Sequence, residues 1–187
     1  MTSWQRGSRP AAPNMTLKDI PYLSQWDDDA KLSRGDCLIV CVAMLAAWRG
    51  NPISPDALLR KAGLPVGRLT YTFAEGIVAA RVAGVALRHV RPAAWNTIRV
   101  EIDAQRPVVA LLRYGVLSGN QDSSDVAHFV VVLGYDATHV VMHDPNWWDE
   151  RREEGAFRRV PLSEFQRAIG VPLSETGNMS WQSLYIV

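Results

Sequence analysis

An almost unbroken apolar run from Leu38 to Trp48 constrains the fold more than any other stretch of this sequence. Its alanine, leucine and methionine residues favour a helix, and Gly50 suits the position just after the end of that helix. Apolar residues would fall on every face, so the helix is expected to be buried all round. The run therefore predicts a central helix in the core of a globular domain.

Cys37 directly precedes this run and is expected in the first turn of the helix. There the N–H groups without helical partners and the positive end of the helix dipole favour a thiolate, the reactive form of cysteine. The alternative is an inert core cysteine, which is also the role expected for Cys41. A disulfide between the two is not expected, because one helix face does not give the required geometry.

Composition narrows the class of protein. The chain has 187 residues, 48% of them hydrophobic, and a formal net charge of +1. A chain of this length can form one domain with a substantial core. No basic stripe indicates nucleic-acid binding. Two cysteines four residues apart make neither a disulfide framework nor a zinc site, so neither a metal nor a cofactor is expected.

The sequence shows neither a membrane span nor a signal peptide. No stretch reaches transmembrane length, and residues 1–14 lack the apolar core of a signal peptide. Free thiols suit a reducing compartment. We therefore expect a cytoplasmic protein without membrane contact, with a flexible tail over residues 1–14 and a single domain over residues 15–187.

The chain divides into a helical first half and a valine-rich second half. Ser54 and Pro55 can begin a helix that Gly63 ends, and Thr72 and Glu75 form a capping-box pattern. Later valine- and leucine-rich stretches favour strands. Strands are predicted at 85–90, 107–114, 128–135, 140–143, 157–160 and 183–187, with helices at 55–62, 73–82, 93–105 and 163–169. This order predicts an α+β fold with N-terminal helices packed on a C-terminal antiparallel sheet.

A nucleophilic cysteine needs a base, a group that orients the base, and donors for the oxyanion. His128 opens one predicted strand, and Asp144 follows the next. In an antiparallel hairpin the start of one strand lies beside the end of the other. A three-residue connection over 136–138 would place Val130 opposite Asp144 and His128 diagonally on the same face. Asp144 could instead be a turn residue before proline.

The other histidines are weaker candidates for the base. His89 lies in a predicted strand without polar neighbours, and His139 lies in a turn. His143 is adjacent to Asp144, and successive side chains in a strand point to opposite faces. His128 is therefore the predicted base.

Four segments of the chain together resemble a known family. They are Pro21-Tyr22-Leu23-Ser24-Gln25-Trp26, Asp36-Cys37, His128-Phe129-Val130-Val131-Val132-Leu133-Gly134-Tyr135 and His143-Asp144-Pro145. The family is the bacteriocin-processing (double-glycine leader) peptidase-like family of papain-like cysteine peptidases, and the resemblance covers about Ile20 to Trp148. It implies a papain-like fold with Cys37 as nucleophile, His128 as base, Asp144 as the orienting group, and Gln25 with the Cys37 N–H as oxyanion donors.

Some features depart from this pattern or leave its use open. The family usually has glycine after the cysteine, where this chain has Leu38. No transporter segment follows, so the resemblance is to the stand-alone branch. Trp147 and Trp148 could line a substrate groove or cover the core. Three functions fit: a peptidase or isopeptidase acting on a peptide or protein, a related amide transferase or deamidase, and an inactive relative that binds peptides or a protein partner.

Overall fold

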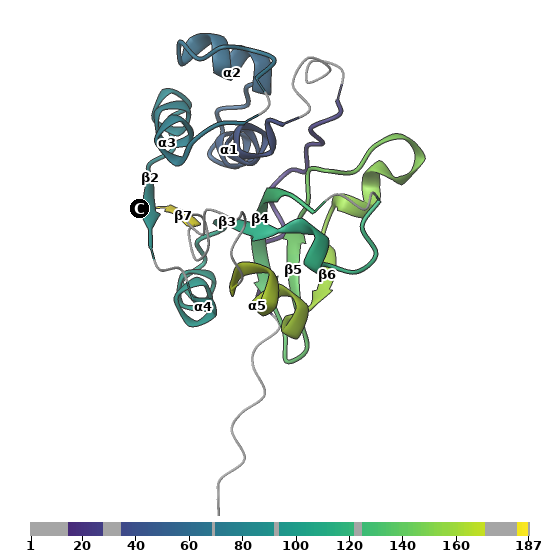
Figure 1. The fold of residues 1–187 in the computed structure, drawn as a ribbon. Helices are drawn as coiled ribbons and strands as arrows, with labels where there is room; N and C mark the ends of the chain where they lie inside the picture. Colours follow the sequence, from purple (N-terminus) through teal and green to yellow (C-terminus); the bar gives the residue numbers. More distant parts are fainter. Residues whose placement is uncertain are drawn as a thin grey trace, which may run out of the picture.

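The computed structural model describes residues 15–27, 35–68, 70–91, 94–121, 125–170 and 183–186 (Figure 1). The predicted tail over residues 1–14 lies outside these ranges. Across the described ranges, none of the helices combines the length and the apolar character needed to cross a membrane.

The three expected N-terminal helices form where their start and stop signals lie. Helix α1 (Cys37–Trp48) begins at the cysteine, and Gly50 follows it with φ +81°. Helix α2 (Pro55–Lys61) has its proline in the first turn. Helix α3 (Phe73–Val82) carries the complete capping box predicted from Thr72 and Glu75, with both side-chain-to-backbone hydrogen bonds formed. The residues of α1 from Cys37 to Ala46 are buried, as its all-round apolar pattern predicts.

The second half of the chain forms the expected antiparallel sheet. The strand order is β2-β7-β3-β4-β5-β6, and the short strand β1 pairs with β4. The strands are β1 (Met15–Thr16), β2 (Leu87–Val90), β3 (Val108–Arg113), β4 (Ala127–Tyr135), β5 (His139–His143), β6 (Arg158–Pro161) and β7 (Ser183–Ile186). Among the described residues, strand β1 and the 3-10 segments η2 (Tyr114–Val116) and η3 (Asp149–Gly155) were not anticipated by the sequence pattern.

Helices cover both faces of this sheet (Figure 1). Alternate residues of β4 separate the two cores: Phe129 and Val131 pack with α1 to α3, whereas Val130 and Val132 face the other way. That second core is closed by α4 (Trp95–Asp103) and α5 (Leu162–Gly170). The predicted α+β arrangement is confirmed, with a second helical layer added to it.

Residues 136–138 lie between strands β4 and β5, as the sequence predicted, but the pairing beside the turn is one residue out of the predicted register. Tyr135 pairs with Val140, and a bulge between Val132 and Gly134 shifts the register. Beyond it Val131 pairs with His143, so the next position along brings Val130 opposite the residue after His143. The predicted register at the rim is confirmed, and the bulge is what restores it, since a one-residue slip would turn Asp144 to the other face.

Candidate active site

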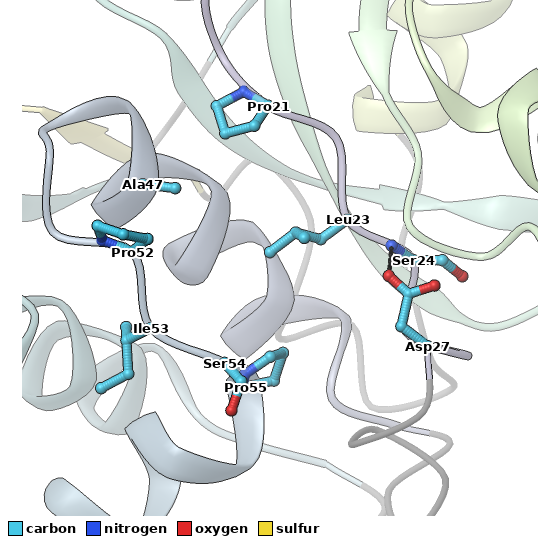
Figure 2. Close-up of a pocket in the computed structure, with 9 residues that line it drawn as sticks. All are labelled: Pro21, Leu23, Ser24, Asp27, Ala47, Pro52, Ile53, Ser54 and Pro55. Carbon is cyan, nitrogen blue, oxygen red and sulfur yellow. Dashed lines mark hydrogen bonds between the residues drawn. The ribbon is translucent and has the colours of Figure 1, made fainter.

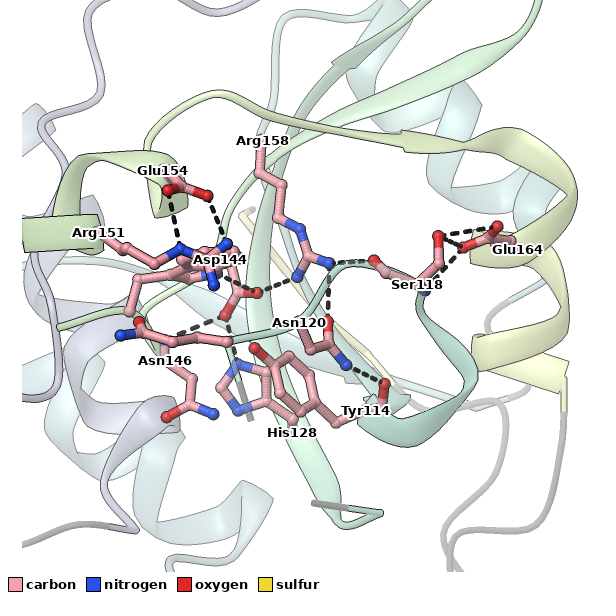
Figure 3. Close-up of polar contacts among 12 residues, drawn as sticks. Tyr114, Ser118, Asn120, His128, Asp144, Asn146, Arg151, Glu154, Arg158 and Glu164 are labelled. Atoms are coloured by element: carbon pink, nitrogen blue, oxygen red, sulfur yellow. Dashed lines mark hydrogen bonds and ion pairs between the residues drawn. The ribbon is translucent and has the colours of Figure 1, made fainter. Parts of the chain in front are cut away.

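His128 and Asp144 meet at the rim of the sheet, where β4 begins and β5 ends (Figure 3). The His128 Nε2 atom lies 2.8 Å from Oδ1 of Asp144. Both residues are buried, with 3% and 0% of their surfaces exposed. The hairpin geometry inferred from the sequence therefore brings these two side chains into direct contact.

Cys37 is the first residue of α1, which places its backbone N–H at the open end of the helix. Its exposed fraction is 9%, whereas Cys41, one turn further along, is fully buried. A hydrogen bond with the Cys37 side chain is one of the interactions that raise the pKa of His128. Since Nε2 of the imidazole contacts Asp144, Nδ1 is the nitrogen left to interact with the thiol.

Burial and charge act in opposite directions on the pKa of His128. Burial is the largest effect and lowers the pKa, but the charge and hydrogen bond of Asp144, followed by the Cys37 contact, raise it to about 10. For Asp144, burial acts to raise the pKa. The charge and hydrogen bond of His128, with Arg158, instead hold it well below its usual range. The pair is therefore a carboxylate and an imidazolium at neutral pH.

Asp144 accepts three further hydrogen bonds. Its Oδ1 atom also accepts the Asn146 backbone N–H at 3.1 Å. Its Oδ2 atom accepts the Trp147 indole N–H at 3.0 Å and Arg158 Nη1 at 2.5 Å. The Asn146 bond is the local turn contact expected of an aspartate before proline, and the same oxygen contacts His128.

Gln25 joins this group through the segment that follows Asp144. Its backbone N–H donates to the carbonyl of Pro145 at 2.9 Å, and its Nε2 donates to Oδ1 of Asn146 at 3.2 Å. The same Asn146 oxygen accepts the Trp26 indole N–H at 3.0 Å. The side-chain amide of Gln25 is thus buried and fixed in orientation next to the histidine–aspartate pair.

The backbone of Asp144 is also held from two sides. The Tyr22 hydroxyl donates to its carbonyl at 3.0 Å, and its N–H donates to the Gly155 carbonyl at 2.9 Å. A Cβ atom at Gly155 would lie only 2.4 Å from the carbonyl oxygen of Asp144, as well as inside contact distance of Tyr22. Glycine is therefore required at residue 155 for the close approach of η3 to the site.

His143 takes no part in this cluster. Its Nδ1 accepts the Phe157 backbone N–H at 3.1 Å, so the proton is on Nε2, which lies 2.8 Å from the Ile20 carbonyl. Burial lowers the pKa of His143, which opposes protonation. His143 is a neutral, hydrogen-bonded core residue that fastens the N-terminal segment to the sheet.

The structure also shows how Leu38 is accommodated and where the two tryptophans lie. Leu38 is 1% exposed, and its Cδ2 atom would lie 2.8 Å from a Cβ atom at Gly76, so a glycine of α3 makes room for the leucine. Trp147 covers the core, at 2% exposure, and its indole also holds Asp144. The half-buried Trp148 instead stacks at a tilt with Trp26, with 4.9 Å between ring centroids.

A neighbouring pocket of about 370 Å³ lies between the N-terminal segment and the connection from α1 to α2 (Figure 2). Its wall is mostly apolar, and the polar side chains at one end are Ser24 and Asp27, on either side of Gln25 in the chain. None of the four predicted catalytic residues lines it. Within the residues that the structure describes, no cluster of His, Cys, Asp or Glu has the make-up of a metal site.

Sequence reasoning missed Asn146 and Arg158 as residues that hold the site. A signal for Arg158 did exist. It stands two positions before Val160 in a strand, and alternate residues share a face, so the pattern places this cation on the buried face. No sequence signal indicated that Asn146 would bridge Gln25 and Trp26, because that contact depends on segments 120 residues apart.

Solved structures of similar architecture support this description. A protein from Bacillus anthracis assigned as a C39-like peptidase matches with a TM-score of 0.62 and 18% identity, covering 94% of this chain and 98% of that chain. A double glycine motif protease from an AMS/PCAT transporter, solved with its leader peptide, matches with a TM-score of 0.58 and 16% identity, covering 94% and 96%. The peptidase domain of Streptococcus ComA gives 0.57 and 16%, covering 82% and 91%. At these identities the likeness shows the fold, which is papain-like.

Comparison of sequences gives the family. None of the curated proteins matches the chain. The model described as Peptidase_C39 like family matches residues 17–167, which is most of the chain and includes Gln25, Cys37, His128 and Asp144. The resemblance inferred from the sequence is confirmed: the chain belongs to the Peptidase_C39 like family of papain-like cysteine peptidases.

Proposed function

We propose that this protein is a thiol peptidase that hydrolyses a peptide or isopeptide amide bond through Cys37, His128 and Asp144. The observation that carries the proposal is the position of the His128 imidazole. One nitrogen lies 2.8 Å from the Asp144 carboxylate, and the Cys37 thiol at the start of a helix is among the groups that raise the pKa of the ring. This is the arrangement of nucleophile, base and orienting carboxylate that acyl transfer needs.

In the first half of the reaction, the Cys37 thiolate attacks the carbonyl carbon of the substrate amide. The oxygen becomes an oxyanion, and the Cys37 backbone N–H and the Gln25 amide donate hydrogen bonds to it. His128 then gives its proton to the amide nitrogen, the C–N bond breaks, and the amine leaves. A thioester remains on Cys37.

In the second half, the now neutral His128 takes a proton from water as the water oxygen attacks the thioester. The C–S bond breaks, the carboxylic acid product leaves, and the thiolate and imidazolium are restored. Asp144 stays ionised throughout, because its pKa is held low, and it fixes the tautomer and stabilises the imidazolium.

A peptide or protein is the proposed substrate. The double glycine motif protease of similar fold was solved with a leader peptide, and the family is one of peptidases. Both cysteines of this chain are free, which suits thiol chemistry in a reducing compartment such as the cytoplasm. Neither nucleic acid nor a membrane is part of the proposed reaction.

Cleavage of a peptide library in heavy-oxygen water tests the proposal. The wild-type protein should generate new amino termini and matching carboxylates that carry one heavy oxygen, and Cys37→Ala should generate none. Cys41→Ala is the matched control, because Cys41 is a fully buried thiol one turn along the same helix. Products that contain a new adduct in place of the labelled acid would indicate amide transfer. Peptide binding without any product, equal in wild type and Cys37→Ala, would indicate an inactive binding protein.

A further inference from the structure

Arg158 contacts the oxygen of Asp144 that His128 does not use. It lies in β6 opposite Met142 of β5, which places it diagonally across from Asp144. Its Nη1 atom is 2.5 Å from Oδ2 of Asp144, and only 8% of the arginine side chain is exposed. A buried arginine beside a carboxylate is a strong, directional partner, since its planar fork cannot be deprotonated in proteins.

The rest of the guanidinium is fixed as well (Figure 3). Its Nη2 atom donates to the Ser118 carbonyl at 2.8 Å and to Oδ1 of Asn120 at 2.7 Å. The group also lies over the Trp147 ring, 5.2 Å from its centroid, and that indole holds the same Asp144 oxygen. The loop that carries Ser118 and Asn120, together with the Trp147 ring, therefore holds Arg158 in position independently of Asp144.

Two cations share the single charge of Asp144: His128 on Oδ1 and Arg158 on Oδ2. Asp144 favours the protonated imidazole, and a nearby fixed positive charge disfavours it. Other charged or titratable groups face the cluster from the elements around it, and all are retained in the variants below. They are Cys37 of α1, Tyr22 of the N-terminal segment, Tyr114 of η2, Arg151 and Glu154 of η3, and Glu164 of α5.

We propose that Arg158 is a positioning residue for the base: it fixes the Asp144 carboxylate and limits how strongly that carboxylate retains the proton on His128. The proposal rests on the proposed function in that His128 acts as the base for Cys37. Arg158 lies outside the predicted set of catalytic residues. The consequence is that His128 loses its proton at a lower pH than it would beside Asp144 alone. In the peptidase reaction this makes the imidazolium a better proton donor to the leaving amine.

The test is the titration midpoint of the His128 imidazole, measured by NMR on the full chain with labelled histidine. In Arg158→Gln the midpoint should rise by about one pH unit, a tenfold change in the proton equilibrium. This is the size of effect expected when a positive charge on the same carboxylate is lost. Arg158→Lys retains the charge and should restore the midpoint to within about 0.3 units. Arg159→Gln is the matched control: its guanidinium pairs with Asp136 at the opposite end of the hairpin, and the midpoint should not move.

If Arg158→Gln folds and its His128 midpoint is unchanged or lower, the proposal is overturned. A fall in melting temperature without a rise in the midpoint would mean that Arg158 has only a structural role. Should Arg158→Gln fail to fold, Asn120→Asp decides. It keeps the arginine and places a carboxylate on Nη2, which should raise the midpoint by a few tenths of a unit; no rise would overturn the proposal. The midpoint does not depend on amide hydrolysis, so a failed shift leaves the peptidase proposal standing, and an inactive protein can still show the shift.

Discussion

His128 and His143 are two buried histidines at the same end of one hairpin, but their pKa values are shifted in opposite directions. His128 contacts an ionised carboxylate and the thiol, and its pKa is raised. His143 contacts two backbone groups, and its pKa is lowered. Burial opposes the charge on both rings, so the difference comes from their partners.

Distance along the sequence does not decide which histidine contacts Asp144. His143 is adjacent to Asp144, yet the alternation of the strand sends it to the N-terminal segment. His128 is 16 residues from Asp144 and reaches it across the hairpin. We therefore predict that His128 is needed for the reaction and His143 for stability.

Among substitutions that leave both histidines in place, the largest effect should come from removing the charge of Asp144, the carboxylate that His128 contacts. Asp144→Asn should reduce amide hydrolysis by about four orders of magnitude, because the imidazole loses its tautomer control and counter-charge. The remaining rate should stay above that of His128→Ala. Asp136→Asn is the control, since Asp136 pairs with Arg159 at the other end of the hairpin. Equal rates in the two asparagine variants would show that Asp144 has no part in the reaction.

Gln25→Ala is expected to have the next largest effect. Turnover should fall by about a hundredfold or more, on the order of 3 kcal/mol, because the amide would act on charge that develops in the transition state. The melting temperature should fall by only a few degrees, since the side chain donates a hydrogen bond to Asn146 and its loss removes no core packing. Losses of stability and activity in equal measure would instead make Gln25 a structural residue.

His143→Ala should show the reverse pattern. It leaves the Ile20 carbonyl and the Phe157 N–H without their partner, so the free energy of unfolding should fall by about 2–4 kcal/mol in denaturant titrations. Hydrolysis, measured well below the melting temperature, should change by less than about threefold. His139→Ala is the comparison variant: its ring is partly exposed and bonds the Thr138 side chain, and stability should hardly change. A stable but inactive His143→Ala protein would reverse the assignment.

The smallest effect is in the pH dependence of stability. With its folded pKa raised, His128 contributes stability that is present below about pH 6.5 and lost as pH rises toward its folded value. With its folded pKa lowered, His143 contributes stability that is lost as pH falls below about 6.5, because only the unfolded chain binds the proton there. Urea titrations should find the alkaline decline reduced in His128→Gln, whereas the decline just below about pH 6.5, which comes from His143, should be unchanged in that variant. An unchanged alkaline decline would remove the case for an imidazolium.

Much of the fold was predictable because its signals are local. The capping box at Thr72 and the glycine after α1 each mark a boundary that the structure confirms. The register at the rim was also predictable, since a slip by one residue would turn every side chain of a strand to the other face. The bulge between Val132 and Gly134 was not, because it depends on packing on both faces of the sheet.

The candidate site was predictable only where residues lie near each other in sequence or follow a strand pattern. The strand pattern places Arg158 on the buried face, but no short-range pattern encodes its contact with Asn120 or the contact of Asn146 with Gln25. Strand β1 is two residues long, too short to leave a periodic signal.

The pH dependence of Cys37 alkylation tests the central claim most directly. Iodoacetamide labelling, followed by mass spectrometry, would compare wild type, His128→Ala and His143→Ala, with Cys41 as the internal control; it is fully buried, and burial raises its pKa. Wild type and His143→Ala should label Cys37 rapidly at about pH 6, because an imidazolium beside the thiol favours the thiolate. His128→Ala should label slowly there, and Cys41 should react only after denaturation. Loss of the low-pH reactivity in His143→Ala, with its retention in His128→Ala, would contradict the account.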